Sequence, residues 1–359
     1  MGQKIDIKKT KKKLKQKLKL HRVNSHEELK PPEIAWGMLT SDESKLSILG
    51  TLGNFSLIIG KAKSRKSFFI SMVTSVASST DKLLKPFQSR LPKGKGNVLY
   101  FDTEQGKYHV QLALKRICKQ INITNPKNLY VYGLRSLKPK SRLNLIEYAI
   151  YNNDKVGFIV IDGIKDLITS INSEEEATEI ASKLLKWTEE RNIHIVCVLH
   201  QNKGDTNARG HLGSELTHKA ETVLSVTKSQ EDKSISIVEA EMCRNEEPDT
   251  FAFEIINGIP IQVENFEERT ITKKKKYDIL DIPPFRIYQL LTDVFSKKNE
   301  YKYAELMIAI KAAHKVQLRR SVGNNAIRDL MSHMKNMDWL LQETNRGSYK
   351  LGEYKTETE

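Results

Sequence analysis

A short basic segment led by glycine, residues 60–67, carries the residue types that bind a chain of phosphates. It follows the apolar run 55–59 and precedes a helical pattern, which is the strand–loop–helix context of a phosphate-binding loop. In such a loop the backbone N–H groups wrap the phosphates, and the N-terminus of the helix adds partial positive charge. We expect Lys66 to neutralise the β- and γ-phosphates and the hydroxyl of Ser67 to hold Mg²⁺. The segment predicts a site for ATP and Mg²⁺ formed by Gly60, Lys61, Ala62, Lys63, Ser64, Arg65, Lys66, Ser67 and Phe68.

One residue of this segment departs from the usual motif, which has glycine directly before the lysine. Here that residue is Arg65. A side chain is tolerated at this position only if the backbone adopts a conformation that a non-glycine residue can reach. The alternative interpretation is a basic turn in front of a buried helix, and acidic residues elsewhere in the chain argue against it.

Two carboxylates follow apolar runs and complete the expected chemistry. Asp162 ends the run 158–162, about 100 residues after the phosphate motif, where it would lie beside the metal. Many buried strands end in aspartate, so Asp162 supports the prediction only in combination. Glu104 follows the run 98–102 and is placed to orient and deprotonate an attacking water, the alternative being an ordinary solvated loop acid.

Together these three sites resemble the RecA-like ATPase family. The narrower resemblance is to the RepA and DnaB-type replicative helicases and related ATPases of plasmids and mobile elements, and it covers roughly residues 30–262. The resemblance implies that Glu104 is the catalytic glutamate and Asp162 the Walker B aspartate. It also implies a homo-oligomer, expected to be a hexameric ring, with ATP between subunits.

The same resemblance suggests a sensor and a channel loop. The family places a polar sensor of the γ-phosphate after the strand corresponding to 193–199, and either His200 or Gln201 fits that role. Residues 203–214 resemble the mobile loop that lines the channel of RecA-like rings. Within it, Lys203 and Arg209 are candidates for contacts with DNA phosphates, and Arg209 is alternatively placed to reach a neighbour's ATP. A surface loop without a ligand is the other interpretation.

The segment 241–245 resembles the Arg-Asn segment with which replicative helicases supply an arginine finger to the neighbouring subunit. Arg244 is the candidate finger. The helicases often carry a basic residue two positions earlier, where this chain has Met242. This difference is a departure from a complete helicase-like trans site.

Alternating patterns predict an α/β fold over residues 31–266. Apolar runs of strand length alternate with helical stretches, which is typical of a mostly parallel twisted sheet flanked by helices. The last runs are separated only by turns and predict an antiparallel extension at one edge. The expected strands are 55–59, 98–102, 129–132, 158–162, 193–199, 222–226 and 235–240, and the helices include 66–79, 108–120, 141–152 and 174–191.

After a linker at 267–282, residues 283–353 predict a small second domain, followed by a tail at 354–359. Three helical patterns, 285–295, 303–313 and 324–337, precede two short strands, which is a winged-helix pattern. Such a domain binds duplex DNA through its third helix and wing, here with Arg328 and Arg346. It serves in other proteins for protein docking, and that alternative stays open.

Composition points to a polyanionic partner. The formal net charge is +15 and the pI is about 9.4, which favours nucleic acid. Lysines crowd residues 1–30, which we expect to form a disordered or only partly helical basic arm that either grips phosphates or only aids solubility. Three widely spaced cysteines fit neither a zinc site nor a disulfide framework, and no apolar run reaches the ~20 residues that span a bilayer. We therefore expect a cytoplasmic protein without a membrane partner.

The sequence thus favours an ATP-driven DNA motor in replication or maintenance of a plasmid or mobile element. A DNA-binding regulator or recombination accessory, controlled by ATP but without strand separation, is the second hypothesis. A signalling ATPase without a DNA role is the third, and the basic arm and the winged-helix pattern argue against it.

Overall fold

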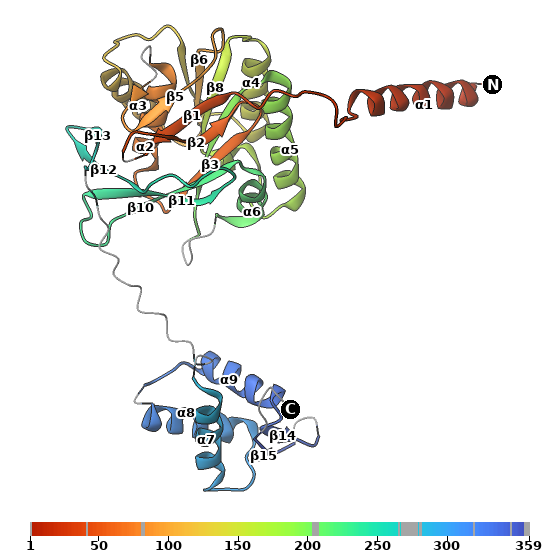
Figure 1. The fold of residues 1–359 in the computed structure, drawn as a ribbon, viewed down its shortest axis with the longest axis vertical. Helices are drawn as coiled ribbons and strands as arrows, with labels where there is room; N and C mark the ends of the chain where they lie inside the picture. Colours follow the sequence, from red (N-terminus) through yellow and green to blue (C-terminus); the bar gives the residue numbers. More distant parts are fainter. Residues whose placement is uncertain are drawn as a thin grey trace. The chain divides into compact units, whose positions relative to one another are not determined.

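The computed structural model forms two compact units, Met1–Phe266 and Glu267–Glu359 (Figure 1). It describes residues 2–40, 42–79, 83–202, 208–264, 266, 279, 282–318, 320–344 and 347–354, without the side chains of residues 2–9 and 83.

A nine-stranded sheet forms the centre of the first unit, in the order β13-β12-β11-β10-β3-β9-β8-β6-β7. The strands from β10 to β7 in this order pair in parallel, and β11, β12 and β13 extend the sheet beyond β10 as antiparallel strands. The predicted mostly parallel sheet with an antiparallel edge is therefore confirmed. The strands are β3 (Phe55–Gly60), β6 (Asn97–Asp102), β7 (Leu129–Gly133), β8 (Val156–Asp162), β9 (His194–His200), β10 (Thr222–Lys228), β11 (Ile235–Cys243), β12 (Phe251–Ile256) and β13 (Ile259–Gln262).

Helices cover both faces of this sheet, which explains the continuous apolar runs. Every residue of β3 and β8 is buried. On one face, α2 (Lys66–Ser78) buries Phe69, Ile70 and Val73, and α3 (Lys107–Gln120) packs beside it. The other face is covered by α4 (Pro139–Tyr151), α5 (Glu174–Arg191), α6 (Gly210–Lys219) and the short 3-10 helix η1 (Ile164–Leu167).

A small second sheet, which the sequence patterns did not predict, completes the cover beside α2. Its order is β2-β1-β5-β4, with β1 (Ile34–Leu39), β2 (Leu46–Thr51), β4 (Leu83–Leu84) and β5 (Phe87–Ser89). The fully buried Trp36 joins it to the main core, since its ring lies 6.1 Å from that of Phe87 and 6.4 Å from that of Phe158.

The order of the parallel strands decides which side chains meet. Strands β3, β9, β8 and β6 are consecutive neighbours, and their carboxyl ends lie at one edge of the sheet. In this register Gly60 lies opposite His200, and Asp102 lies opposite Asp162. This edge is where open α/β sheets bind ligands.

The structure changes two expectations for the first unit. The basic arm, expected to be disordered or only partly helical, is helical over α1 (Gly2–Leu20), because lysine, glutamine and leucine have good helix propensity and no proline interrupts them. Its side chains from residue 10 to 20 are exposed. Residues 210–214 of the expected channel loop belong to α6, while residues 203–207 lie outside the described part of the chain. Throughout that part, no helix is both long and apolar enough to cross a bilayer.

In the described residues of the second unit, three α-helices precede a hairpin: α7 (Pro284–Phe295), α8 (Tyr303–Gln317), α9 (Asn324–Asn336), β14 (Leu340–Gln342) and β15 (Tyr349–Leu351). The backbone of Tyr301, just before α8, pairs with that of Tyr349 in β15. The apolar faces of the three helices surround the fully buried Trp339.

The sequence boundaries of the second unit also differ from those expected. Ile279 and Ile282 are buried in its core, so the expected linker contributes to the folded unit. The ring of Tyr354, placed in the expected tail, stacks on Trp339 with the centroids 5.4 Å apart. In both cases an apolar side chain gains burial by joining the core.

Candidate active site

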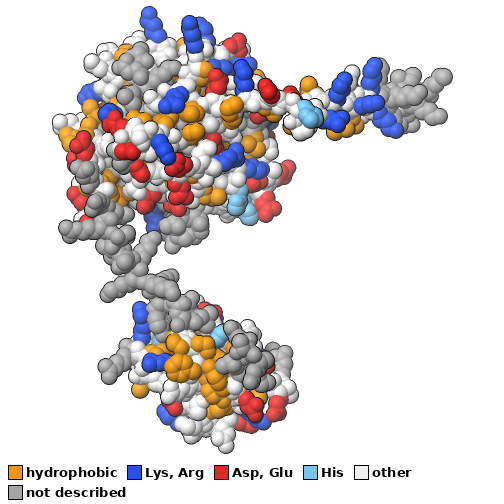
Figure 2. Space-filling view, viewed as in Figure 1, with side chains coloured by type: hydrophobic (Ala, Val, Ile, Leu, Met, Phe, Trp, Pro, Cys, Tyr) orange, Lys and Arg blue, Asp and Glu red, His pale blue; other side chains and the backbone are white. Residues whose placement is uncertain are grey.

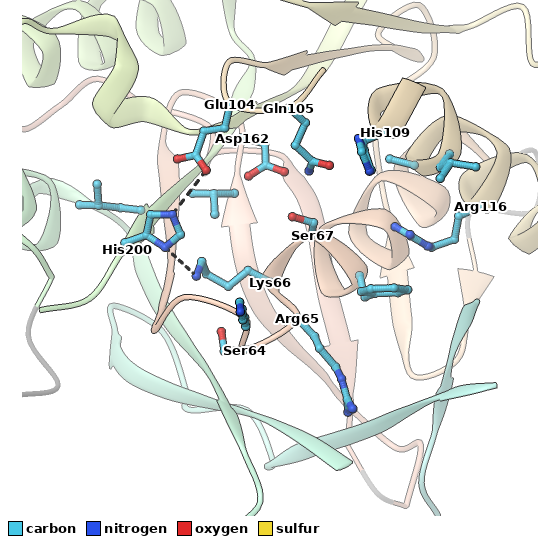
Figure 3. Close-up of a pocket in the computed structure, with 16 residues that line it drawn as sticks. Ser64, Arg65, Lys66, Ser67, Glu104, Gln105, His109, Arg116, Asp162 and His200 are labelled. Atoms are coloured by element: carbon cyan, nitrogen blue, oxygen red, sulfur yellow. Dashed lines mark hydrogen bonds and ion pairs between the residues drawn. The ribbon is translucent and has the colours of Figure 1, made fainter. Parts of the chain in front are cut away.

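A cavity of about 470 Å³ lies between the loop after β3 and helix α3 (Figure 3). Residues 63–68 line one side of it. Glu104, Asp162 and His200, which follow or end three other strands, line it as well. The residues that the sequence analysis selected from four separate segments are thus brought together at one edge of the sheet.

The loop backbone is shaped to present N–H groups. Lys63 and Arg65 both have left-handed conformations, with φ of 65° and 73°, and such alternation makes a concave row of amides that suits an anion. A left-handed residue with a Cβ costs about 1–2 kcal/mol, so other contacts must hold Arg65. Gly60 is required for space, because a Cβ there would lie 2.4 Å from the carbonyl oxygen of Val226.

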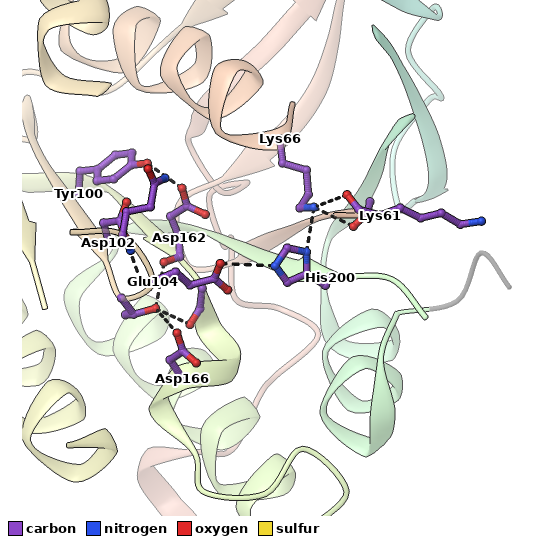
Figure 4. Close-up of polar contacts among 12 residues, drawn as sticks. Lys61, Lys66, Tyr100, Asp102, Glu104, Asp162, Asp166 and His200 are labelled. Carbon is purple, nitrogen blue, oxygen red and sulfur yellow. Dashed lines mark hydrogen bonds and ion pairs between the residues drawn. The ribbon is translucent and has the colours of Figure 1, made fainter. Parts of the chain in front are cut away.

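Lys66 is buried at the start of α2 and points across the loop (Figure 4). Its Nζ donates to the carbonyl oxygens of Gly60, at 2.8 Å, and Lys61, at 3.0 Å. Burial lowers the pKa of Lys66 to about 8, so the ammonium is still charged at neutral pH. The nearby Ser64 Oγ is buried and has no hydrogen-bond partner in the described residues. A charged donor beside an unpartnered hydroxyl fits a phosphate chain.

Two buried carboxylates lie side by side opposite the loop. Asp162 accepts a hydrogen bond of 2.9 Å from the hydroxyl of Tyr100, and it also bonds Ser67. Burial, followed by the charge of Asp102, raises the pKa of Asp162 to about 6. Asp102 Oδ2 is itself buried without a hydrogen-bond partner in the described residues. Carboxylate and hydroxyl oxygens in this arrangement are the donors that Mg²⁺ prefers.

Glu104 reaches into the cavity from the loop after β6. Its backbone N–H and that of Gln105 donate to Asp102 Oδ1, at 3.0 and 2.7 Å, which fixes the loop. The side chain is 39% exposed, and Oε2 lies 3.4 Å from Nε2 of His200. This hydrogen bond is the main cause that lowers the pKa of Glu104, so the group is an ionised carboxylate able to accept a proton.

Close packing ties this loop to the end of β8. The hydroxyl of Thr103 donates to the carbonyl oxygen of Gly163, at 2.8 Å, and lies 3.2 Å from Asp166 Oδ2. Gly163 has a φ of 100°, and a Cβ on it would lie 2.2 Å from Thr103 Oγ1. Glycine is therefore needed for Glu104 to lie beside Asp162.

His200 connects the two ends of the cavity. Its Nδ1 lies 3.1 Å from Lys66 Nζ, and its Nε2 faces Glu104. Because the ammonium can only donate, the Nε2 of His200 carries the proton in this arrangement. Gln201, the other sensor candidate, is only 5% exposed, and its backbone N–H donates to the carbonyl oxygen of Gly60 at 3.1 Å.

The sequence analysis missed several residues around the site. Tyr100 and Asp102 belong to the apolar run 98–102, which ends in aspartate as the run 158–162 does. This shared ending was the sequence signal that could have marked Asp102 as a site residue. The guanidinium of Arg116 lies 3.8 Å from the ring centroid of Phe68, and its Nε donates to the carbonyl oxygen of Gly258. No local pattern marks Arg116, because its partners lie far away in the sequence.

Arg209 and Arg244, the remaining described candidates of the first unit, do not line this cavity. Arg244 is exposed, follows β11 and contacts Asn54 Oδ1 at 3.4 Å. That contact is at the sheet edge opposite the phosphate loop, since Asn54 precedes β3 and Gly60 ends it. Arg209, before α6, and Arg328, on α9, are exposed. Lys203 and Arg346 lie outside the described residues.

A buried lysine after a central strand, with acids at the ends of two neighbouring parallel strands, defines a RecA-like P-loop ATPase. A family profile described as an AAA domain matches residues 26–206, about half of the chain, and the protein belongs to that family. The chain is also similar to a solved structure titled "Crystal structure of the RadB recombinase", with 13% identity and a TM-score of 0.43 over 59% of this chain and 92% of that chain. No curated protein matches the sequence significantly.

The raised pKa of Asp162 predicts that Asp162→Asn stabilises the protein while damaging the metal site. The folded pKa of about 6 lies above the ordinary 3.8, so ionisation of Asp162 opposes folding. The penalty is absent below pH 3.8, grows between the two values and is complete above pH 6, where it reaches roughly 3 kcal/mol. In urea unfolding of the metal-free proteins, the free energy of unfolding of Asp162→Asn should exceed that of wild type by this full amount at pH 8 and by about half of it at pH 5.

Asp154→Asn is the matched control for this prediction. Asp154 is exposed, and its pKa is lowered by the hydrogen bond from Arg191, so the variant should gain no stability at pH 8. An Asp162→Asn variant that is no more stable than wild type at pH 8 would contradict the proposed burial of an ionised carboxylate.

Proposed function

We propose that the protein is an ATP-hydrolysing DNA motor, helicase-like and assembled as a ring, that acts in replication or maintenance of a plasmid or mobile element. The observation that carries the proposal is the chain of contacts from Lys66 through His200 to Glu104, beside Ser67 and Asp162. These contacts connect the phosphate loop, the water-activating carboxylate and the end of β9. Residues 203–214 follow shortly after β9 in the sequence.

Each residue has a distinct role in the proposed hydrolysis. The ammonium of Lys66 exchanges its loop carbonyl partners for phosphate oxygens of ATP, and the N–H groups of the loop bind the remaining oxygens. Ser67 and Asp162 would hold Mg²⁺, which supplies positive charge to the β- and γ-phosphates. Glu104 accepts the proton of the attacking water. His200, in contact with both Lys66 and Glu104, acts as the sensor of the γ-phosphate.

A ring explains why Arg244 lies away from the cavity of its own chain. An arginine finger supplied in trans must be exposed and must face a neighbour's nucleotide, and Arg244 is exposed at the sheet edge opposite the loop. The hexameric ring of the DnaB-type helicases is the assembly we propose. Glu104 and Lys66 of one subunit would then face Arg244 of the next.

Positive charge supports DNA as the partner. The net charge is +15, and Figure 2 shows basic side chains along the described part of α1. We propose that α1 and the segment containing Lys203 and Arg209 contact DNA phosphates. We further propose that the second unit is a winged-helix domain, since three helices precede a hairpin and Tyr301 adds a third short pairing to β15. In that assignment Arg328 and Arg346 contact duplex DNA.

The DNA role predicts stimulated and salt-sensitive activity. Single-stranded or duplex DNA should raise the ATPase rate, and the DNA affinity should fall steeply with salt because phosphate contacts release counterions. Removing residues 2–20 should flatten the plot of log affinity against log salt by about 0.9 for each lost phosphate contact. An ATPase rate that DNA does not change, together with a salt-independent affinity, would refute the motor.

A second candidate is an ATP-regulated DNA-binding or recombination accessory protein that does not separate strands. Met242, in place of the basic residue that helicases often carry two positions before the finger, favours it. Displacement of an annealed strand in the presence of ATP distinguishes the two: the motor releases the strand, whereas the accessory binds DNA and hydrolyses ATP slowly.

A further inference from the structure

Arg65 occupies the loop position that the phosphate-loop motif gives to glycine. Its backbone is left-handed, with φ of 73° and ψ of 25°. Glycine adopts this conformation without a steric penalty, whereas a residue with a Cβ needs contacts that hold it there. The side chain of Arg65 is half-buried and extends away from Lys66 and Ser67 toward the blue-green strands (Figure 3). Its guanidinium therefore acts elsewhere than on the phosphates.

The guanidinium is held by the turn between β10 and β11. Nη1 donates to the carbonyl oxygen of Ser234 and to Ser236 Oγ, the latter at 3.4 Å. Nη2 donates to the carbonyl oxygen of Lys233 at 3.1 Å. A planar guanidinium suits two successive carbonyls, since its N–H groups point in fixed directions that an ammonium cannot reproduce. One side chain of the loop is thus bonded to two residues of the turn and to one residue at the start of β11.

The start of β11 makes a second link to the loop, and a hydrogen bond within the turn orders the turn itself. Ser236 is fully buried, and its hydroxyl lies 3.5 Å from the carbonyl oxygen of Ser64. Asp232 Oδ1 accepts a hydrogen bond of 2.7 Å from the backbone N–H of Ser234, which fixes the carbonyls that face the guanidinium. Hydrogen bonds from Ser234 and, as a smaller cause, the charge of Arg65 lower the pKa of Asp232.

We propose that Arg65 is a positioning residue that holds the phosphate loop in its binding shape by fastening it to the β10–β11 turn. In this protein a side-chain tether replaces the backbone freedom of the missing glycine. Strand β11 contains one acceptor of Arg65, Ser236, and ends at Cys243, directly before Arg244, so one strand joins the loop to the proposed finger. The inference rests on the proposed ATP site for its effect on binding, but the tether exists without ATP.

Hydrogen exchange of the nucleotide-free protein tests the tether directly. Arg65→Gly keeps a residue that accepts the left-handed backbone but removes the bonds to the turn, so amides of residues 229–236 should exchange about 10-fold faster. Lys63→Gly is the matched control, because Lys63 is also left-handed and its side chain is exposed. That variant should leave exchange in the turn unchanged. Unchanged exchange in Arg65→Gly, or equal acceleration in both variants, would overturn the proposal.

A double-mutant cycle tests the effect on the phosphate loop. Arg65→Gly should raise the Kd for ATP about 10-fold, as expected for losing charge-assisted hydrogen bonds that order the loop. Asp232→Ala, which loosens the turn, should weaken ATP binding in the wild-type background and have no further effect in Arg65→Gly. Fully additive effects, or a neutral Asp232→Ala, would mean that Arg65 acts without the turn and would overturn the proposal. A wild-type protein that binds no ATP would refute the proposed function, while the exchange experiment would still decide on the tether.

Discussion

Glu104→Gln should bind ATP almost as well as wild type and hydrolyse it about 10²–10⁴-fold more slowly. The amide keeps the shape of the side chain and can still accept a hydrogen bond from His200, whose Nε2 lies 3.4 Å from Glu104 Oε2. It cannot take a proton from water. The lowered pKa of Glu104 means that the wild-type group is ionised at neutral pH and ready to accept that proton. Single-turnover hydrolysis and equilibrium ATP binding, measured together, separate the two effects.

Glu43→Gln provides the control for this substitution. Glu43 is an exposed acid of the same unit that pairs with Lys85 outside the cavity, so its replacement should leave turnover near the wild-type rate. If Glu104→Gln retained more than about half of the turnover, another group would have to accept the proton, and the assignment of Glu104 would fall.

Arg244→Ala should slow hydrolysis about 10³-fold without weakening ATP binding to the single chain, because an arginine finger stabilises charge that develops only in the transition state. Arg244 is exposed and bonded to Asn54 at the edge opposite the loop, so the proposed finger can act only on the nucleotide of another subunit. The defect should therefore appear only under conditions in which the protein assembles.

Mixing subunits gives the decisive form of this test. The Arg244→Ala subunit keeps Lys66, and the Lys66→Ala subunit keeps Arg244. A mixture should therefore regain ATPase activity at those subunit interfaces where an intact Lys66 faces an intact Arg244. Arg90→Ala, an exposed arginine that contacts Gln88, should behave as wild type in the same mixtures. If the mixture regained no activity, or if Arg244→Ala turned over normally, Arg244 would not be the finger.

The sequence could predict those parts of the site in which a reactive residue type lies at the end of an expected parallel strand. Asp162 and Glu104 follow apolar runs, and parallel strands end at a common edge, so both acids were expected near Lys66. The same argument applied to Asp102, which ends its run and lies opposite Asp162. Asp102 was missed because the pairing of β6 with β8 is set by the tertiary structure and cannot be read from the sequence of either strand. Only this relation makes two ordinary strand-end aspartates into a coupled pair.

Other features depend on contacts that no local pattern encodes. Strands β1, β2 and β5 are short, and their apolar residues pack in the core beside α2. Their positions do not follow a hydrophobic periodicity that would predict a strand. Arg65 looked like a defect in the phosphate motif, whereas its acceptors, about 170 residues later in the chain, make the left-handed backbone tenable. Repulsion among lysines left disorder and partial helix both open for the N-terminal arm, and helix propensity prevails over that repulsion in α1.

Turnover of ATP by the purified protein, measured beside Lys66→Ala, tests the central claim most directly. Because the ammonium of Lys66 is buried against the loop carbonyls, we propose that phosphate binding depends on this residue. Wild type should bind ATP and hydrolyse it with Mg²⁺ present, and Lys66→Ala should lose detectable turnover and most of the affinity. A wild-type protein without ATP affinity, or a Lys66→Ala variant as active as wild type, would contradict the account.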